Sequence, residues 1–194
     1  KIDSLDLMTL GNGVNFGDLI SAHANKGAYS NNIRGIFIGG STTDNMDYVT
    51  IASDGNGIDF GNLTQSRGYS PGTSSSTRGL CLGGWAGSNP PSNIIDYVEI
   101  MTLGDALDFG DLFTGRYSGS QFSSPTRAFV FAGSSNNDGT KVGSIEMVTI
   151  SSKGNATDFG DAAILSQYHQ NGSSSSTRGI VAGGYNPNYL TDIQ

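Results

Sequence analysis

The stretch Gly-Asn-Ala-Thr-Asp-Phe-Gly-Asp at residues 154–161 decides the fold, because three near copies of it lie earlier in the chain. The copies read Gly-Asn-Gly-Val-Asn-Phe-Gly-Asp at 11–18, Gly-Asn-Gly-Ile-Asp-Phe-Gly-Asn at 55–62 and Gly-Asp-Ala-Leu-Asp-Phe-Gly-Asp at 104–111. A segment that returns at a fixed period of roughly 20–50 residues indicates a tandem-repeat architecture. The residues around these copies should therefore repeat as well.

Three other features recur at a fixed phase of the same unit: an acidic residue that opens it, an Arg after the Phe, and a Gly that closes it. The opening acids are Asp3, Asp47, Asp96 and Glu146, with Asp192 expected to open a further unit, and the periods between them are 44, 49, 50 and 46 residues. The Arg residues are Arg34, Arg78, Arg127 and Arg178, and the closing glycines are Gly40, Gly84, Gly133 and Gly184. Nearly all length variation falls between the closing Gly and the next acid, which predicts an exposed loop there.

The apolar pattern of the unit is that of short strands. Each Arg precedes a run such as Leu80-Cys81-Leu82, which is typical of a strand buried on both faces. Each opening acid precedes an alternating segment such as Tyr97-Val98-Glu99-Ile100, typical of a strand with one solvated face. Pairs such as Gly55-Asn56 predict hairpin turns. With the Phe-Gly-Asp segment and the Ser/Gly-rich stretch before the Arg, each unit has room for three or four strands, and no segment has a helical period.

Composition excludes several functional classes. The net charge is −7, the sequence pI is about 4.5, and no Lys/Arg cluster is present, which argues against binding nucleic acid or anionic membranes. No apolar stretch approaches the about 20 residues that a spanning helix needs, so no membrane insertion is expected. Cys81 is the only cysteine, so an intrachain disulfide is excluded. Because the chain begins at Lys1 without Met, we expect a processed product or a piece of a longer protein.

In this order the residues resemble kelch repeats, which combine an Arg, a buried strand ending in Gly-Gly, a strand with a Tyr, and a later aromatic residue. Here these are Arg78, the segment 80–84, Tyr97 and Phe109, and the same order recurs in all four copies. Phe stands where kelch repeats usually have Trp. The Gly-Asn-Ala-x-Asp-Phe-Gly-Asp run, followed by Ser-Ser-x-Thr-Arg-Gly, is similar to kelch-like repeats in virion structural proteins of tailed bacteriophages, particularly marine ones. That resemblance implies a location on a virion or another extracellular surface.

The expected fold is all-β: a kelch-like β-propeller built from four repeats of 44–50 residues in a single domain, 1–194. The repeats span approximately 3–46, 47–95, 96–145 and 146–191, and residues 192–194 begin a further strand. Two arrangements stay open. The chain either closes as a four-bladed ring, or it forms part of a larger propeller or one shared between chains, which would make it a homo-oligomer.

Repetition argues against catalysis. A catalytic carboxylate pair needs two unlike environments, whereas the recurring Asp residues share one pattern and are expected to cap turns. His23 and His169 are not at equivalent positions, and Cys81 lies in a predicted buried strand, so we expect neither a metal nor another cofactor. The recurring Arg residues are expected to bond backbone carbonyls or an Asp of a neighbouring unit.

The variable loops are the candidate binding sites, because their aromatic and amide side chains suit sugars or protein surfaces. The candidate residues are Trp85, Asn89 and Asn93 in one loop, Asn136 and Asp138 in the next, and Tyr185 and Asn186 in the last. The expected function is a non-catalytic structural and binding module, such as a tail-fibre or virion surface component that mediates host attachment or assembly. Its partner would be a glycan or another virion or surface protein. The alternatives are a kelch-type protein-interaction scaffold and a carbohydrate-active or copper enzyme.

Overall fold

The protein is all-β. The computed structural model describes residues 1–41, 43–70, 72–87, 90–136, 138–166, 172–186, 188–189 and 191–194, and these ranges contain sixteen strands and no helix. Accordingly, nothing in these ranges resembles a membrane-spanning helix. All strand pairs are antiparallel, and every strand is joined to its neighbour by a short connection, as the short apolar runs and Gly-rich turns predict.

Three full sheets of four strands make up most of the chain. Sheet I consists of β3 (Gly27–Ser30), β4 (Arg34–Ile38), β5 (Asn45–Thr50) and β6 (Ile58–Asn62). Sheet II consists of β7 (Gly72–Ser74), β8 (Arg78–Gly84), β9 (Ser92–Glu99) and β10 (Leu107–Asp111). Sheet III consists of β11 (Ser120–Ser123), β12 (Arg127–Phe131), β13 (Ser144–Thr149) and β14 (Thr157–Asp161). In each sheet the strands lie in sequence order.

Two incomplete sheets flank these three. The N-terminal hairpin pairs β1 (Ile2–Ser4) with β2 (Val14–Gly17), and by sequence these strands correspond to the third and fourth strands of a full sheet. The C-terminal pair joins β15 (Gly172–Ser174) to β16 (Gly179–Val181), which correspond to the first and second strands. The sheets are therefore offset from the sequence repeats: each full sheet takes its first two strands from one repeat and its last two from the next.

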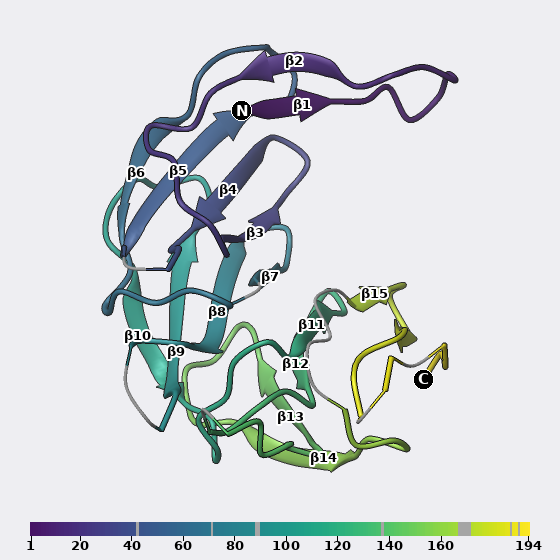
Figure 1. The fold of residues 1–194 in the computed structure, drawn as a ribbon. Helices are drawn as coiled ribbons and strands as arrows, with labels where there is room; N and C mark the ends of the chain where they lie inside the picture. Colours follow the sequence, from purple (N-terminus) through teal and green to yellow (C-terminus); the bar gives the residue numbers. More distant parts are fainter. Residues whose placement is uncertain are drawn as a thin grey trace.

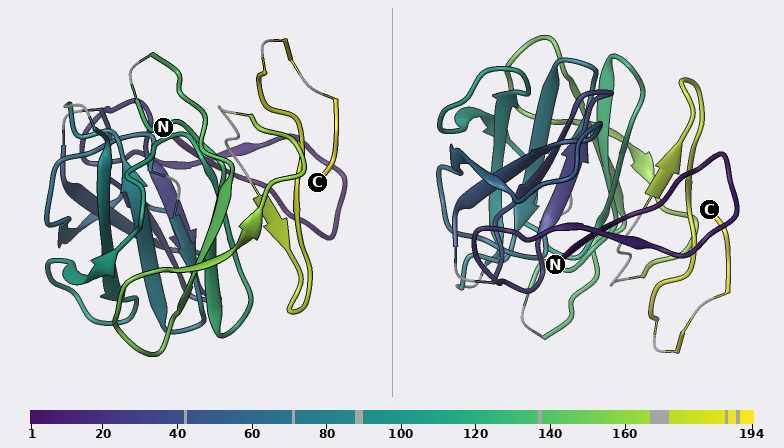
Figure 2. Two further views of the ribbon diagram at one scale, coloured as in Figure 1. Left: turned by 90° about the horizontal axis from the view of Figure 1, so that it is seen from below. Right: turned by 90° about the horizontal axis from the view of Figure 1, so that it is seen from above.

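The sheets pack face to face in an open arc (Figures 1 and 2). Their first strands lie on the inside, where β3 contacts β7, β7 contacts β11, and β11 contacts β15. A row of serine hydroxyls joins these strands, each donating to a carbonyl of the preceding sheet at 2.7 Å: Ser74 to Ser30, Ser123 to Ser74, and Ser174 to Ser123. The N-terminal hairpin and the C-terminal pair lie at the two ends of the arc, with a gap between them (Figure 1).

The hydrophobic core lies between sheets rather than within one. One cluster joins Ile36, Ile38 and Phe60 of sheet I to Cys81 and Val98 of sheet II. A second cluster repeats this contact between sheets II and III, with Leu80, Leu82 and Phe109 against Val130 and Val148. The run that follows Arg78 is buried on both faces for this reason, because sheet II is covered by sheets I and III, whereas in the run after Arg127 the side chain of Phe129 is only partly buried.

The Gly-Asn and Gly-Asp pairs have a role that the sequence did not reveal. They lie in the hairpin connections between the third and fourth strands, as predicted, and they also bind the preceding sheet. The amide of Gly104 donates to the Phe60 carbonyl at 2.9 Å, and the Asp105 carboxylate accepts from the Asn62 amide. A Cβ at Gly61 would overlap the Gly104 carbonyl, so close approach of two backbones requires a glycine in the Phe-Gly-Asp segment.

The prediction for the recurring Arg residues is confirmed for two of them. The Arg34 guanidinium donates to the Ile100 carbonyl of the next sheet at 3.0 Å, and Arg78 donates to the carbonyls of Ile150 and Ser151 at 3.0 and 3.1 Å. Each also lies over a Tyr ring of its own sheet, Tyr48 or Tyr97. These arginines hold neighbouring sheets together.

The position expected for Asp192 is wrong by two residues. Gln194 pairs with Val181 through two backbone hydrogen bonds of 2.7 and 2.8 Å, in the register in which Asp96 pairs with Cys81 and Glu146 with Val130. Residue 194 therefore takes the place of the opening acid. The segment between Gly184 and this strand position is two residues longer than predicted. The prediction failed because composition alone does not distinguish an acidic residue in a loop from one on a strand.

Candidate functional site

The variable loops and the connections between sheets gather at one end of the strands, which we call the loop end. The loops are residues 85–91 and 132–143, between the second and third strands of sheets II and III. The connections are residues 63–71 and 112–119, which lead from one sheet to the first strand of the next. Backbone bridges between Gly68 and Trp85, and between Tyr117 and Ser134, tie loops to connections. The turns at residues 75–77 and 100–106 lie at the opposite end.

Three aromatic side chains meet at the loop end: Tyr69, Trp85 and Tyr117. The Tyr117 ring lies 5.4 Å from Trp85 and 6.1 Å from Tyr69, centroid to centroid, in tilted and edge-on orientations. The Tyr117 hydroxyl donates to the Asn136 carbonyl at 3.4 Å. We call this set the aromatic cluster. It brings together one loop residue and two connection residues from both sides of sheet II, with Tyr69 40% exposed.

Tyr69 has a backbone conformation that its side chain disfavours. Its φ is +52°, in the left-handed region, whereas the equivalent positions in the neighbouring connections are Asn25 at +62° and Ser118 at +54°. Asn is among the few residues that adopt this region readily, while a bulky residue there is strained by about 1–2 kcal/mol. Strained backbone conformations of this kind occur most often at functional sites.

Replacing Tyr69 by Asn is expected to separate stability from binding. Relief of about 1–2 kcal/mol of backbone strain offsets the loss of an edge-on ring contact of about 0.5–1.5 kcal/mol, so the free energy of unfolding should change by less than about 1 kcal/mol. Urea denaturation measures this, with S118N as the matched control. A loss above about 2 kcal/mol in Y69N, alongside a silent S118N, would show that Tyr69 is primarily a packing residue.

Beneath the cluster, buried ion pairs clamp the connections to the sheets. The Asp96 carboxylate on β9 accepts hydrogen bonds from the Arg67 guanidinium at 2.8 Å, the Thr64 hydroxyl at 2.6 Å and the Thr64 amide at 3.1 Å. Arg67 and Asp96 are 0% and 1% exposed. The opening acid of the repeat is therefore a fastening point for the chain that arrives from the preceding sheet.

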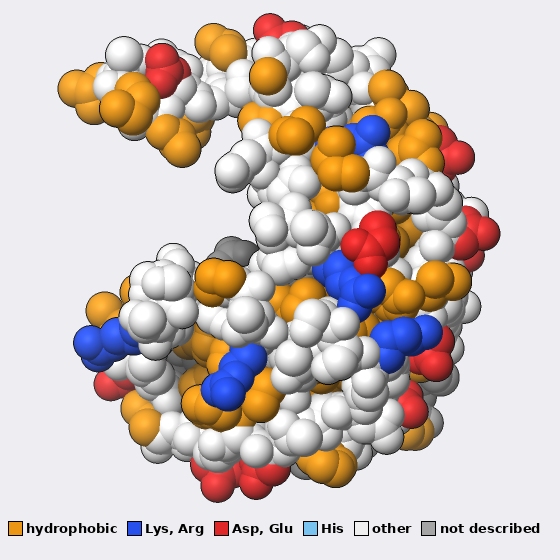
Figure 3. All heavy atoms as spheres, turned by 180° about the vertical axis from the view of Figure 1, so that it is seen from behind, with side chains coloured by type: hydrophobic (Ala, Val, Ile, Leu, Met, Phe, Trp, Pro, Cys, Tyr) orange, Lys and Arg blue, Asp and Glu red, His pale blue; other side chains and the backbone are white. Residues whose placement is uncertain are grey.

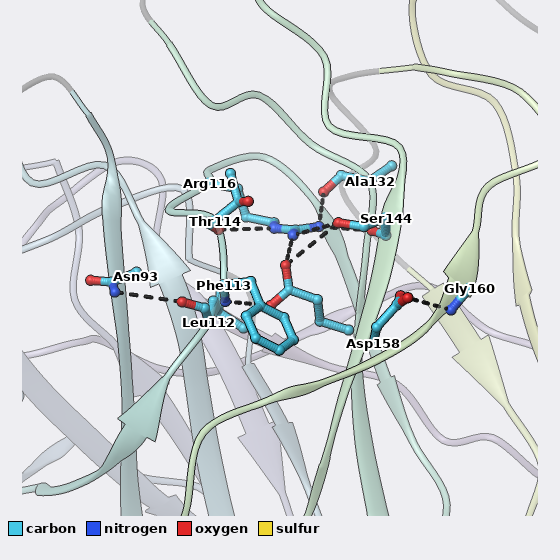
Figure 4. Close-up of polar contacts among 10 residues, drawn as sticks. Asn93, Leu112, Phe113, Thr114, Arg116, Ala132, Ser144, Asp158 and Gly160 are labelled. Atoms are coloured by element: carbon cyan, nitrogen blue, oxygen red, sulfur yellow. Dashed lines mark hydrogen bonds and ion pairs between the residues drawn. The ribbon is translucent and has the colours of Figure 1, made fainter.

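The next clamp repeats this arrangement with Arg116 and Glu146, which form a fully buried ion pair. Arg116 lies between Ala132, Ser144 and Thr114 (Figure 4), and donates to the Ser144 carbonyl at 2.8 Å and its hydroxyl at 2.9 Å. Glu146 also accepts from the Phe113 amide at 2.8 Å. Burial lowers the pKa of Arg116, and the charge of Glu146 opposes this effect.

The equivalent positions at Asp47 of sheet I and at Gln194 beside the C-terminal pair hold different residues. At the last one, Gln194 accepts from the Ile164 amide at 2.9 Å, and Ser166 stands at the position of Arg116. Neutral residues thus replace both the acid and the base. At the first clamp His23 stands at the arginine position, and Lys26 supplies a cation 3.9 Å from Asp47. Burial lowers the pKa of Lys26, and Asp47 opposes this effect.

The thiol and the potential metal ligands of the chain do not form a reactive site among the described residues. Burial raises the pKa of the Cys81 thiol, which keeps it protonated and a poor nucleophile. Within the described ranges, no three His, Cys, Asp or Glu side chains come close enough to hold a metal ion. His169 lies outside those ranges.

The predicted binding residues are only partly brought together. Trp85 joins the aromatic cluster and Asn136 contacts it through its carbonyl, whereas Asn89 lies outside the described residues. Asn93 is not in the loop but on β9, where its amide approaches the Leu112 carbonyl at 3.5 Å. Asp138 bonds Thr140 of its own loop, which lowers the pKa of the Asp138 carboxyl. Tyr185 packs on Tyr189, 5.6 Å away, and the Asn186 amide donates to the Asn188 carbonyl.

Sequence reasoning missed Tyr69, Tyr117 and the buried Arg67 and Arg116. A signal for them exists: both arginines lie seven residues after the Phe of the repeat, and each is followed within two residues by a Tyr. The signal appears in two of the four copies, and it becomes informative only once the connection is known to fold over the next sheet.

Comparison of the sequence with models of known protein families finds no match, and comparison with curated proteins finds none either. The internal repeats and the geometry of the loop end therefore carry the functional argument.

Proposed function

We propose that the chain is a non-catalytic binding and assembly module, built as part of a kelch-like β-propeller, that recognises a glycan through the aromatic cluster. The observation that carries the proposal is the meeting of Tyr69, Trp85 and Tyr117 at the loop end, with Tyr69 held in a strained backbone conformation. Flat aromatic faces beside backbone and amide groups suit the apolar faces and hydroxyls of a pyranose ring.

The propeller part of the proposal is supported by the stacking of the sheets. Four-stranded antiparallel sheets whose first strands line the inside of an arc are the arrangement expected of propeller blades. Equivalent residues hold sheet I to sheet II and sheet II to sheet III, namely Arg34 and Arg78. A repeated interface of this kind imposes a constant rotation per sheet, which is what a ring requires.

The non-catalytic part is supported by the use of the ionisable groups. The acids Asp96 and Glu146 are buried and hold the connections to the sheets through hydrogen bonds, which keeps both carboxylates away from solvent. A net charge of −7 favours neutral over anionic glycans, because the field of the protein repels anions. Placement on a phage virion or tail rests on the resemblance of the Phe-Gly-Asp repeats alone.

Replacing Trp85 by Ala is expected to weaken glycan binding at least tenfold, because central aromatic residues dominate binding sites of this type. A glycan array with labelled protein identifies the ligand, and calorimetry then compares W85A with the parent protein. L103A, which truncates an exposed side chain at the opposite end of sheet II, should bind as the parent does. Undiminished binding by W85A, or an array with no hit, would reject the glycan site.

A further inference from the structure

The end of the strands opposite the loop end, which we call the turn end, carries arginines at the same place in successive sheets. Arg34, Arg78 and Arg127 are the first residues of β4, β8 and β12. Figure 3 shows basic side chains spaced along the arc, with most acidic side chains toward its outer rim. An acid placed directly beside one of these arginines therefore departs from the charge pattern of this face.

Glu99 is such an acid. The residue paired with the arginine on the third strand is Thr50 in sheet I and Thr149 in sheet III, but Glu99 in sheet II. The Arg78 Nε donates to the Glu99 carboxylate at 2.6 Å, and the two side chains are 23% and 45% exposed. Arg34 bonds the next sheet without an acid beside it, so the contact between sheets does not require Glu99. An exposed ion pair also contributes little to stability, which leaves Glu99 without a structural role.

Arg78 and Glu99 border a groove of about 380 Å³ between sheets II and III, which we call the turn-end groove. Most of the remaining lining consists of hydroxyl side chains: Ser75, Ser76, Thr77, Thr126 and Ser151. At the equivalent place between sheets I and II, the apolar Ile33 and Met101 stand in the repeat positions of Thr77 and Ser151. The ion pair and the hydroxyl lining thus occur together at the contact of two complete sheets, and not at the contact before it.

The protein itself uses only part of the hydrogen-bonding capacity of this groove. Arg78 donates through Nη1 to the carbonyls of Ile150 and Ser151 at 3.0 and 3.1 Å, and through Nε to one oxygen of Glu99. Among the described residues, neither the Arg78 Nη2 nor the second carboxylate oxygen of Glu99 has a partner, and the same holds for the Ser76 and Ser151 hydroxyls. A charged donor and a charged acceptor therefore lie side by side with free capacity.

The donor is held in place by the protein alone. Besides its bonds to sheet III, the Arg78 guanidinium lies over the Tyr97 ring, 5.0 Å from the centroid, and Tyr97 packs edge-on against Phe109. The Lys153 Nζ lies 5.2 Å from the same centroid, so two cations stand beside the single charge of Glu99 and a cationic ligand is disfavoured. A donor that is already fixed loses little conformational entropy when a ligand binds.

We propose that the turn-end groove binds a neutral saccharide through two adjacent hydroxyls. One hydroxyl accepts from the Arg78 Nη2 and its neighbour donates to the free Glu99 oxygen, because the oxygens of a vicinal diol lie about as far apart as two hydrogen-bonded atoms. Hydrogen bonds to charged groups are the strong ones, and the Ser76 and Ser151 hydroxyls can donate or accept around them. The volume is at the small end of ligand sites, which suits a single sugar residue. The site is independent of the aromatic cluster at the loop end.

An NMR titration of the full chain tests the proposal first. The probes are methyl α-mannopyranoside, methyl β-galactopyranoside, cis-1,2-cyclohexanediol and cyclohexanol, the last of which has a single hydroxyl. We expect the Arg78 Nε–H signal and the amide signals of Ser76 and Ser151 to shift with the diol and with at least one pyranoside, and to stay in place with cyclohexanol. Signals that stay fixed with both pyranosides at about 100 mM, or that shift equally with cyclohexanol, overturn the proposal.

Variants then assign the contact. E99T gives sheet II the residue that sheets I and III have at this position, so the fold should be kept while affinity for the pyranoside falls at least tenfold. D54T removes an exposed acid from a turn of sheet I and should bind as the parent does. Undiminished affinity in E99T rejects the diol contact. W85A should leave the turn-end shifts unchanged, whereas shifts at Trp85 alone would support the aromatic cluster and reject this groove, so the two proposals fail separately.

Discussion

Replacing Arg116 by Ser is expected to lower the free energy of unfolding by about 3–5 kcal/mol, because the substitution leaves the buried charge of Glu146 without its partner. Arg116 is 1% exposed and donates to Glu146 and to both oxygens of Ser144. Without the guanidinium, the buried Glu146 carboxylate keeps only neutral donors, the Phe113 amide at 2.8 Å and the Ser144 hydroxyl at 3.5 Å, and loses its counter-charge. Urea denaturation followed by circular dichroism measures the loss.

The protein itself supplies the control for this variant. At the last clamp Ser166 and Gln194 stand where Arg116 and Glu146 stand, and the Gln194 amide oxygen still accepts from the backbone of the connection. The double variant R116S/E146Q copies this neutral pair. It should recover most of the stability lost in R116S, because a neutral amide costs far less to bury than an unpaired charge. If the double variant were as unstable as the single one, the unpaired charge of Glu146 would not be the cause of the destabilisation.

The fold was predictable from the sequence to the extent that it depends on local pattern. The runs after Arg78 and Arg127 and the alternation after Asp96 specify strands, and β8, β9 and β12 form there. The fixed spacing from Arg to the closing Gly spans the second strand of each sheet, although the strand itself varies from three to seven residues. Packing between sheets is also implied, since a run buried on both faces needs a cover on each side.

The candidate site was less predictable, because it depends on contacts between residues distant in sequence. Nothing local to Tyr69 indicates that its φ is positive or that its ring meets Tyr117, 48 positions later in the chain. The opening acids mark the repeat, but their partners Arg67 and Arg116 lie in the preceding repeat, where Ser or His replaces them in the other copies. The sequence predicts a loop at Asn93 because β9, the strand that contains it, begins with the polar pair Ser92-Asn93.

Replacing Phe109 by Ala is the second change expected to be severe, with a loss of about 3–5 kcal/mol in the free energy of unfolding. Phe109 is 3% exposed, lies edge-on to Tyr97 at 5.8 Å, and belongs to the cluster between sheets II and III. The cavity that the substitution leaves has walls on two sheets, and neither can collapse without breaking the bonds from Gly154 and Ala156 that fix their separation. Urea denaturation again gives the measurement.

F159A is the matched control, since it removes the same side chain from the same position of the next sheet. Phe159 is 55% exposed and, among the described residues, has one ring contact, with Phe129 at 5.0 Å, so in dilute, monomeric protein the loss should be near 1 kcal/mol. The difference between the losses in F109A and F159A measures how much a covering sheet adds to the free energy of unfolding through this Phe position. Equal losses under these conditions would mean that the outer face of sheet III is already covered in the single chain, and the open arc would have to be abandoned.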